Sequence, residues 1–266
     1  MKLHALLVCG CVLAGAASGE KPAQADLDHI REELGVNSFT APSIQLILQE
    51  LNALKPIPFE KVWRDLPDAT PQDRARLALS TGAVIADGFL TVSAEKQSRI
   101  ETVGRVLLKL AKGLGVGEHV TKHSRSILEK AARQQWDDIR AELVQTQAEV
   151  EAALLGLKDE EIAHLIALGG WLRGLEMTST IINEDYSAER ARRLIQPELM
   201  DYFIDRVGTL NPNFKKTKLG VTMEKNLKEI KRITTKPADA PLEPAEVKRI
   251  RELVREINTL IASGEE

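Results

Sequence analysis

The chain has 266 residues, a formal net charge of −3 and two cysteines. This length suffices for a large hydrophobic core without disulfides or metal staples, and the near-neutral charge provides no global attraction to nucleic acid. Aromatic residues make up only 4% of the chain, so Leu, Ile, Val and Ala must fill that core. Because these residues recur at helical spacing through most of the sequence, we expect an all-α, multi-helix bundle.

The first 25 residues have the order of an export signal. Lys2 provides the positive start, an apolar run covers residues 5–19, and Ala23-Gln24-Ala25 offers a cleavage site. The apolar run is shorter than the about 20 residues that a membrane-spanning helix needs. Cleavage there predicts a periplasmic or secreted protein that begins at Asp26. That mature chain would contain no cysteine, which excludes thiol catalysis and thiolate metal sites.

An alternative is a lipoprotein, because Val8-Cys9-Gly10-Cys11 loosely matches a lipobox. In that case Cys11 would become a lipid-modified N-terminus and the protein would sit on a membrane. Cysteine is unusual at position 9, however, and the hydrophobic run continues past Cys11. We therefore favour the cleaved, soluble form.

Helix caps and turn signals divide the rest of the chain into amphipathic segments. Thr70 and Pro71 are typical of a helix start, as N-cap and first helical residue, and the Gly113/Gly115 region is typical of a helix end. We expect the segment 187–207 to break near Pro197. The expected helices cover residues 26–35, 42–54, 71–92, about 100–114, 118–134, 136–156, 159–183 and 187–207.

The composition changes after residue 208. Residues 215–236 are rich in lysine, and a proline-spaced linker leads to a last helix at 244–262. The apolar stripe of that helix is too short for a coiled coil but long enough to dock on another surface. We therefore divide the chain into a signal peptide (1–25), a helical bundle (26–208), and a basic connector with a C-terminal docking helix (209–266).

Two strongly apolar helices each carry one narrow polar stripe, and the stripes hold opposite charges. The helix 71–92 places Asp87 on its stripe, and the helix 159–183 places Arg173 and Glu176 on the other. One interpretation is structural: the stripes face solvent, or Asp87 pairs with Arg173, since buried ions need partners. The other is a cleft in which Asp87 and Glu176 perform acid–base catalysis and Arg173 binds an anion. We favour the structural interpretation.

His119 and His123 are four residues apart and so share one helix face. Val120 occupies the position where a zinc protease motif would have its glutamate. Two histidines make at most half of a tetrahedral zinc site. We therefore expect a pair of surface histidines rather than a metal centre. Phosphate-loop and dinucleotide-binding motifs are also missing, so we expect no cofactor.

Basic residues gather between positions 215 and 232, and Phe214 is the one aromatic residue beside them. Single-stranded nucleic acid needs more aromatic stacking, so we expect no nucleic-acid partner. Attraction to anionic lipid or an acidic envelope polymer is an alternative, at about 1 kcal/mol per charge near such a surface. A solvated helix face is the simpler interpretation. The basic residues are Lys215, Lys216, Lys218, Lys225, Lys228, Lys231 and Arg232.

The stretches Gly82-Ala-Val-Ile-Ala-Asp-Gly-Phe-Leu-Thr-Val92 and Leu168-Gly-Gly-Trp-Leu-Arg-Gly-Leu-Glu176 resemble segments of an uncharacterised family of exported, all-helical bacterial proteins. The similarity extends over most of the mature chain to about residue 207. The resemblance implies export and a helical fold, and it assigns no activity, cofactor or site.

We therefore expect an exported, non-enzymatic binding or scaffold protein of the bacterial cell envelope. Its partner would be an envelope protein, anionic lipid or envelope polymer. Two alternatives remain open. One is an envelope enzyme that uses Asp87, Arg173 and Glu176 in a cleft, and the other is a peripheral binder of anionic surfaces that uses residues 215–236.

Overall fold

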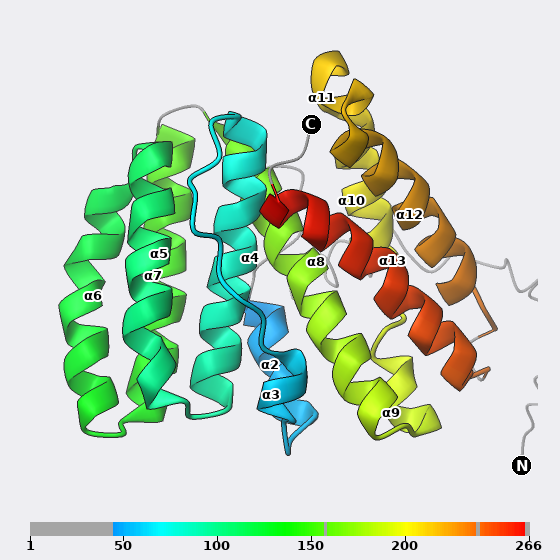
Figure 1. Cartoon of the computed structure of the whole chain (residues 1–266), viewed down its shortest axis with the longest axis horizontal. Coiled ribbons are helices and arrows are strands. Elements are labelled where there is room, and N and C mark those ends of the chain that lie inside the picture. Colours follow the sequence, from blue (N-terminus) through cyan, green and yellow to red (C-terminus); the bar gives the residue numbers. More distant parts are fainter. Residues whose placement is uncertain (1–44, 157–158, 238–239, 264–266) are drawn as a thin grey trace, which may run out of the picture.

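The computed structural model describes residues 45–156, 159–237 and 240–263, and every regular element in these residues is a helix (Figure 1). The expected all-α, multi-helix bundle is therefore confirmed. The expected export signal, Cys9, Cys11 and the helix at 26–35 lie outside the described residues.

Four helices from the first half of the chain stand side by side at one end of the molecule (Figure 1). Turns of two or three residues join them, so neighbours run antiparallel. Two short helices precede them and pack near the centre. In chain order the elements are α2 (Gln45–Ala53), α3 (Phe59–Val62), α4 (Arg74–Ser93), α5 (Gln97–Leu114), α6 (Gly117–Ala132) and α7 (Trp136–Gly156).

The second half of the chain continues from α4 on its other side. The long helix α8 (Glu160–Glu184) packs along α4, and the last helix, α13 (Pro244–Ser263), crosses α8 and contacts α4 (Figure 1). The apolar stripe of α13 is buried, as expected of a docking helix. In the sequence, α8 and α13 are separated by α9 (Ala188–Arg192), α10 (Pro197–Thr209), α11 (Pro212–Lys216) and α12 (Lys218–Thr234).

The helices α4 and α8 approach so closely that their backbones touch. A Cβ atom added to Gly82 would collide with the carbonyl oxygen of Ile166, and one added to Gly169 would collide with that of Leu79. Gly170 takes part in the same approach, because its amide nitrogen lies 2.7 Å from the position of a Cβ on Gly82. A Cβ on Gly174 would instead lie 2.8 Å from the Cγ1 atom of Ile47, in α2.

Helix α4 is apolar because other helices surround it. Among the described residues it is the one helix long and apolar enough to cross a membrane, with a mean hydropathy of 1.3 over its best window. However, 89% of that window is buried inside the protein. Such burial is typical of a core helix, which must be apolar on nearly every side.

Several boundaries follow the sequence signals, and two differ. Gly115 ends α5 in the left-handed conformation with φ 84°, and Pro197 begins α10, as expected. In contrast, α4 begins at Arg74 rather than beside Thr70, because the Asp73 side chain accepts a 2.7 Å hydrogen bond from the Arg76 amide. The expected connector after residue 208 contains the helices α11 and α12, and α12 packs against α10 and α13.

Candidate functional site

Asp87 and Arg173, which the sequence places on two polar stripes, meet between α4 and α8. Arg173 is 1% exposed and Asp87 is fully buried. The Nε atom of Arg173 donates to Oδ1 of Asp87 at 2.8 Å, and its Nη1 donates to Oε2 of Glu176 at 2.9 Å. Its Nη2 donates to the carbonyl of Val62, in α3, at 2.7 Å. Each nitrogen of this buried guanidinium therefore has a hydrogen-bond acceptor.

Both carboxylates also receive bonds from outside this pair of helices. Arg64 donates from Nε and Nη2 to Oδ2 of Asp87, at 3.0 and 2.9 Å. Two residues of α13 reach Glu176: Asn258 donates to Oε2 at 2.9 Å, and Arg255 lies 3.5 Å from Oε1. We call the six side chains the charge hub. Its members are Arg64, Asp87, Arg173, Glu176, Arg255 and Asn258.

The charge hub pairs its buried charges within the protein. Burial alone would lower the pKa of Arg173, but the carboxylates of Asp87 and Glu176 raise it above its ordinary value. Each carboxylate oxygen of the hub has a cationic or amide partner within the protein. This arrangement favours the structural interpretation of the two polar stripes over a catalytic cleft.

His123 joins two helices and is not a surface residue. It is 4% exposed, its Nδ1 lies 2.7 Å from Oε1 of Glu142, and its Nε2 lies 3.2 Å from Oε2 of Glu149. The expected surface pair with His119 is therefore wrong for His123, because this side chain turns toward α7. Among the described residues, no group of three His, Cys, Asp or Glu side chains is placed to hold a metal ion.

The acidic partner of His123 is strongly biased toward its charged form. Burial alone would raise the pKa of Glu142, but hydrogen bonds from Lys130, His123 and Ser126 lower it to about 2. Ion pairs of this kind lose strength when the carboxylate is protonated. The cluster therefore ties α6 to α7 at neutral pH.

The predicted basic residues of 215–232 lie on α11 and α12, whose apolar sides are buried. Some of the positive charge is engaged within the protein: Lys215 donates to the Gly208 carbonyl, Lys228 pairs with Glu224, and Lys231 pairs with Asp201. Three exposed members form no ion pair with the residues that the structure describes. They are Lys216, Lys225 and Arg232.

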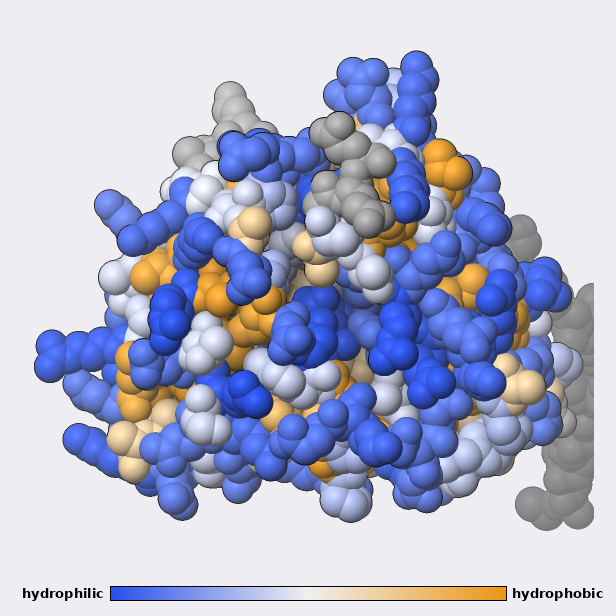
Figure 2. Space-filling view, viewed as in Figure 1, coloured by the Kyte–Doolittle hydropathy of each residue, from blue (hydrophilic) through white to orange (hydrophobic). Residues whose placement is uncertain are grey.

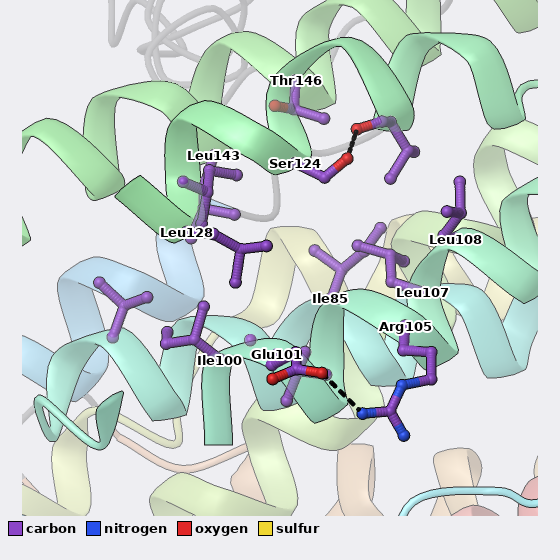
Figure 3. A pocket seen from close by; sticks show the side chains of 16 residues that line it. Ile85, Ile100, Glu101, Arg105, Leu107, Leu108, Ser124, Leu128, Leu143 and Thr146 are labelled. Atoms are coloured by element: carbon purple, nitrogen blue, oxygen red, sulfur yellow. Dashed lines mark hydrogen bonds and ion pairs between the residues drawn. The ribbon is translucent and has the colours of Figure 1, made fainter. Parts of the chain in front are cut away.

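A cavity of about 320 Å³, not predicted from the sequence, lies among α4, α5, α6 and α7 (Figure 3). We call it the apolar cavity. Figure 3 shows leucine and isoleucine side chains pointing into it from several helices. A smaller space of about 40 Å³ shares part of this lining and extends toward Phe89. Representative lining residues are Ile85, Val103, Leu107, Val120, Ile127 and Leu143.

The few polar groups of the apolar cavity are already bonded or lie at its edge. Ser124 donates its hydroxyl to carbonyls of its own helix, as does Thr146, to Glu142 at 2.7 Å. Glu101 and Arg105 form a 3.1 Å pair with exposed side chains (Figure 3). Leu128 is 43% exposed at the opening, and Figure 2 shows hydrophobic surface framed by hydrophilic residues on this side of the molecule.

One feature of the sequence could have indicated this cavity: glycine occurs at two positions in neighbouring helices that face each other. Gly88 of α4 and Gly104 of α5 both line it. A Cβ atom added to Gly104 would meet no atom within 4 Å, and one on Gly88 would meet only the Cγ1 atom of Val103, at 3.5 Å. Side chains missing at these two positions leave space between helices that otherwise carry large apolar residues.

No protein-family model, curated protein or solved structure matches this chain. The resemblance to an exported, all-helical bacterial family therefore stays a prediction. Within the described residues, the geometry offers a charge hub whose buried charges have partners, and an apolar cavity with an open edge, which is suited to binding.

Proposed function

We propose that this protein is an exported, non-enzymatic binding protein of the cell envelope that holds an apolar ligand in the cavity among α4–α7. The cavity itself carries the proposal, because it leaves about 320 Å³ of space between apolar walls. Protein interiors contain few voids larger than a water molecule, and pockets for small molecules begin at roughly 300 Å³. The export part rests on the sequence pattern of residues 1–25.

The walls select the chemistry of the ligand. The hydroxyls of Ser124 and Thr146 already donate to carbonyls of their own helices. A ligand acceptor group buried against these walls would lack a hydrogen-bond donor, at a cost of about 1–3 kcal/mol. An acyl chain or another hydrocarbon chain has no such cost. It gains about 25 cal/mol for each Å² of apolar surface removed from water.

The edge of the cavity suits a polar end group. Glu101 and Arg105 are four residues apart in α5, and their side chains are 74% and 70% exposed. Such exposed helical pairs contribute only about 0.3–0.5 kcal/mol. A ligand's carboxylate or phosphate can therefore replace Glu101 as the partner of Arg105 at little cost. The expected ligand is an amphiphile with one apolar chain.

The proposal is tested with Gly104→Leu in the mature chain. Leucine at this open position should fill the cavity without disturbing its neighbours. The matched control is Gly208→Leu in α10, where an added Cβ also meets nothing within 4 Å, but which does not line the cavity. The probes are N-phenyl-1-naphthylamine, which is neutral, and cis-parinaric acid, which carries a carboxylate; both are followed by fluorescence.

We expect the unchanged protein to bind both probes. Gly208→Leu should bind each probe with the same affinity as the unchanged protein. Gly104→Leu should weaken binding at least tenfold, which corresponds to about 1.4 kcal/mol, while its circular dichroism stays helical. If the unchanged protein binds neither probe, or a folded Gly104→Leu binds them unchanged, the proposed function is wrong.

A further inference from the structure

A second pocket, of about 200 Å³, lies between the start of α8 and the end of α10. We call it the α8–α10 pocket. It shares no lining residue with the apolar cavity and none with the charge hub. Its apolar part includes Leu165, Leu168, Val207 and Leu210, and its polar part includes Glu160, Glu161, His164 and Arg206.

His164 is held in its neutral form and in one orientation. Its Nδ1 is hydrogen-bonded to the hydroxyl of Tyr202, and Arg206 lies over the Tyr202 ring, 5.3 Å from its centre. Burial lowers the pKa of His164 to about 4, with a further contribution from the charge of Arg206. Burial likewise raises the pKa of Tyr202 to about 12. Both groups are therefore neutral at pH 7.

The hydrogen bonds assign the position of the imidazole proton. The phenol of Tyr202 is a stronger hydrogen-bond donor than a neutral imidazole, and the imidazole nitrogen is the stronger acceptor, so the Tyr202 hydroxyl donates to Nδ1 of His164. A neutral imidazole that accepts at Nδ1 carries its hydrogen on Nε2. His164 therefore has a hydrogen-bond donor left over, on the ring atom that faces away from Tyr202.

Charges of opposite sign line the two walls without neutralising each other. Glu160 and Glu161 belong to α8, and Arg206 belongs to α10. Within the described part of the chain, none of the three forms an ion pair, although all border the same pocket. A ligand with a single charge would satisfy one wall and face the like charge of the other.

We propose that the α8–α10 pocket binds a small zwitterion of the α-amino acid class, independently of any ligand in the apolar cavity. The ligand carboxylate accepts hydrogen bonds from Arg206 and from Nε2 of His164. Its ammonium group lies toward Glu160 and Glu161. Charge-assisted hydrogen bonds of this kind are about twice as strong as neutral ones. The leucines and Val207 favour an apolar side chain, such as that of leucine.

The test follows the ring resonances of His164 by NMR in the full mature protein, with L-leucine as the probe. Two relatives of leucine separate the charges: 4-methylpentanoate lacks the ammonium group, and isopentylamine lacks the carboxylate. His164→Gln identifies the resonances. We expect L-leucine to shift them saturably, and each single-charge probe to bind at least tenfold more weakly.

Two variants examine the opposite walls. Arg206→Gln and Glu161→Gln should each weaken L-leucine binding at least tenfold. Arg192→Gln, an exposed arginine outside the pocket, should leave it unchanged. Because the side chain of Glu161 is exposed, its variant tests binding even if Arg206→Gln perturbs the fold. No saturable shift with L-leucine, or equal binding of 4-methylpentanoate, would overturn the proposal.

Discussion

The two sides of α4 are packed in opposite ways. Toward α8, glycine brings the backbones into contact, and the charge hub gives each buried charge a partner. Toward α5, α6 and α7, large apolar side chains meet around about 320 Å³ of space. One helix therefore packs backbone to backbone on one side and forms the wall of a cavity on the other.

This difference assigns separate tasks to the two sides. A contact between backbones cannot adjust, so the α8 side determines how α4 and α8 are placed and stabilises the fold. The cavity side gives up packing energy, since unfilled space forfeits van der Waals contacts. In return, it can receive an apolar ligand without first breaking native contacts.

The largest expected effect comes from adding one methyl group on the tight side. Gly82→Ala and Gly169→Ala should each force α4 and α8 apart and reduce the free energy of unfolding by about 4 kcal/mol or more, the exceptional range for single substitutions. Gly104→Ala, on the open side, should instead stabilise by up to about 1 kcal/mol. Urea denaturation measures all three, and comparable values for Gly82→Ala and Gly104→Ala would remove the contrast.

The next effect concerns the charge hub. Arg173→Met leaves Asp87 and Glu176 buried without their central partner, which should cost about 3–5 kcal/mol. The control is Arg255→Gln, because the Arg255 side chain is 60% exposed and reaches Glu176 at 3.5 Å. That change should stay within about 0.5 kcal/mol. If both variants lose the same free energy of unfolding, burial does not determine how much a hub residue contributes to stability.

On the cavity side of α4, acid should weaken the ion pairs that join α6 to α7. Glu142 has a pKa of about 2 in the folded protein against an ordinary value of 4.5. A lowered carboxylate pKa contributes stability above pH 4.5, and this contribution is lost as the pH falls toward 2. We expect a loss on the order of 1 kcal/mol, because the group is partly screened by solvent.

Glu142→Gln tests this pH dependence. The variant should be less stable at pH 7 and should lose less stability than the unchanged protein between pH 4.5 and pH 2. Hydrogen exchange should place the acid-dependent opening in α6 and α7. An unchanged pH profile in Glu142→Gln would assign the acid sensitivity to other groups.

The smallest effect is expected for adsorption through the basic surface of α11 and α12, which belongs neither to the α8 side nor to the cavity side of α4. Replacing Lys216, Lys225 and Arg232 by Gln should weaken salt-sensitive adsorption to anionic vesicles, at up to about 1 kcal/mol per charge. Replacing Lys228 and Lys231, which have acidic partners, should weaken it less. Both variants should keep their stability. Adsorption that ignores salt and both variants would exclude an anionic-surface role for this segment.

Part of the α8 side of α4 could be predicted from the sequence. The sequence offered pairing of Asp87 with Arg173 as one of its interpretations, beside stripes that face solvent, and the structure shows the pair. Arg64 and Asn258 could not be assigned to the hub, because they lie in segments that only the fold brings there. The contact between Asn258 and Glu176 joins positions 82 residues apart. His123 was misplaced for a similar reason, since the rotation of α6 against α7 decides which of its faces is buried.

The sequence by itself determined most of the long helices and many of their ends, because helical periodicity and capping are local properties, but it did not predict α12. It also indicated that the buried charges of α4 and α8 require partners. Only the tertiary structure decided the apolar cavity and the α8–α10 pocket. Empty space depends on how helices cross, and the residues that surround it come from distant parts of the chain. Packing between helices, rather than composition within them, therefore places the candidate binding sites of this protein.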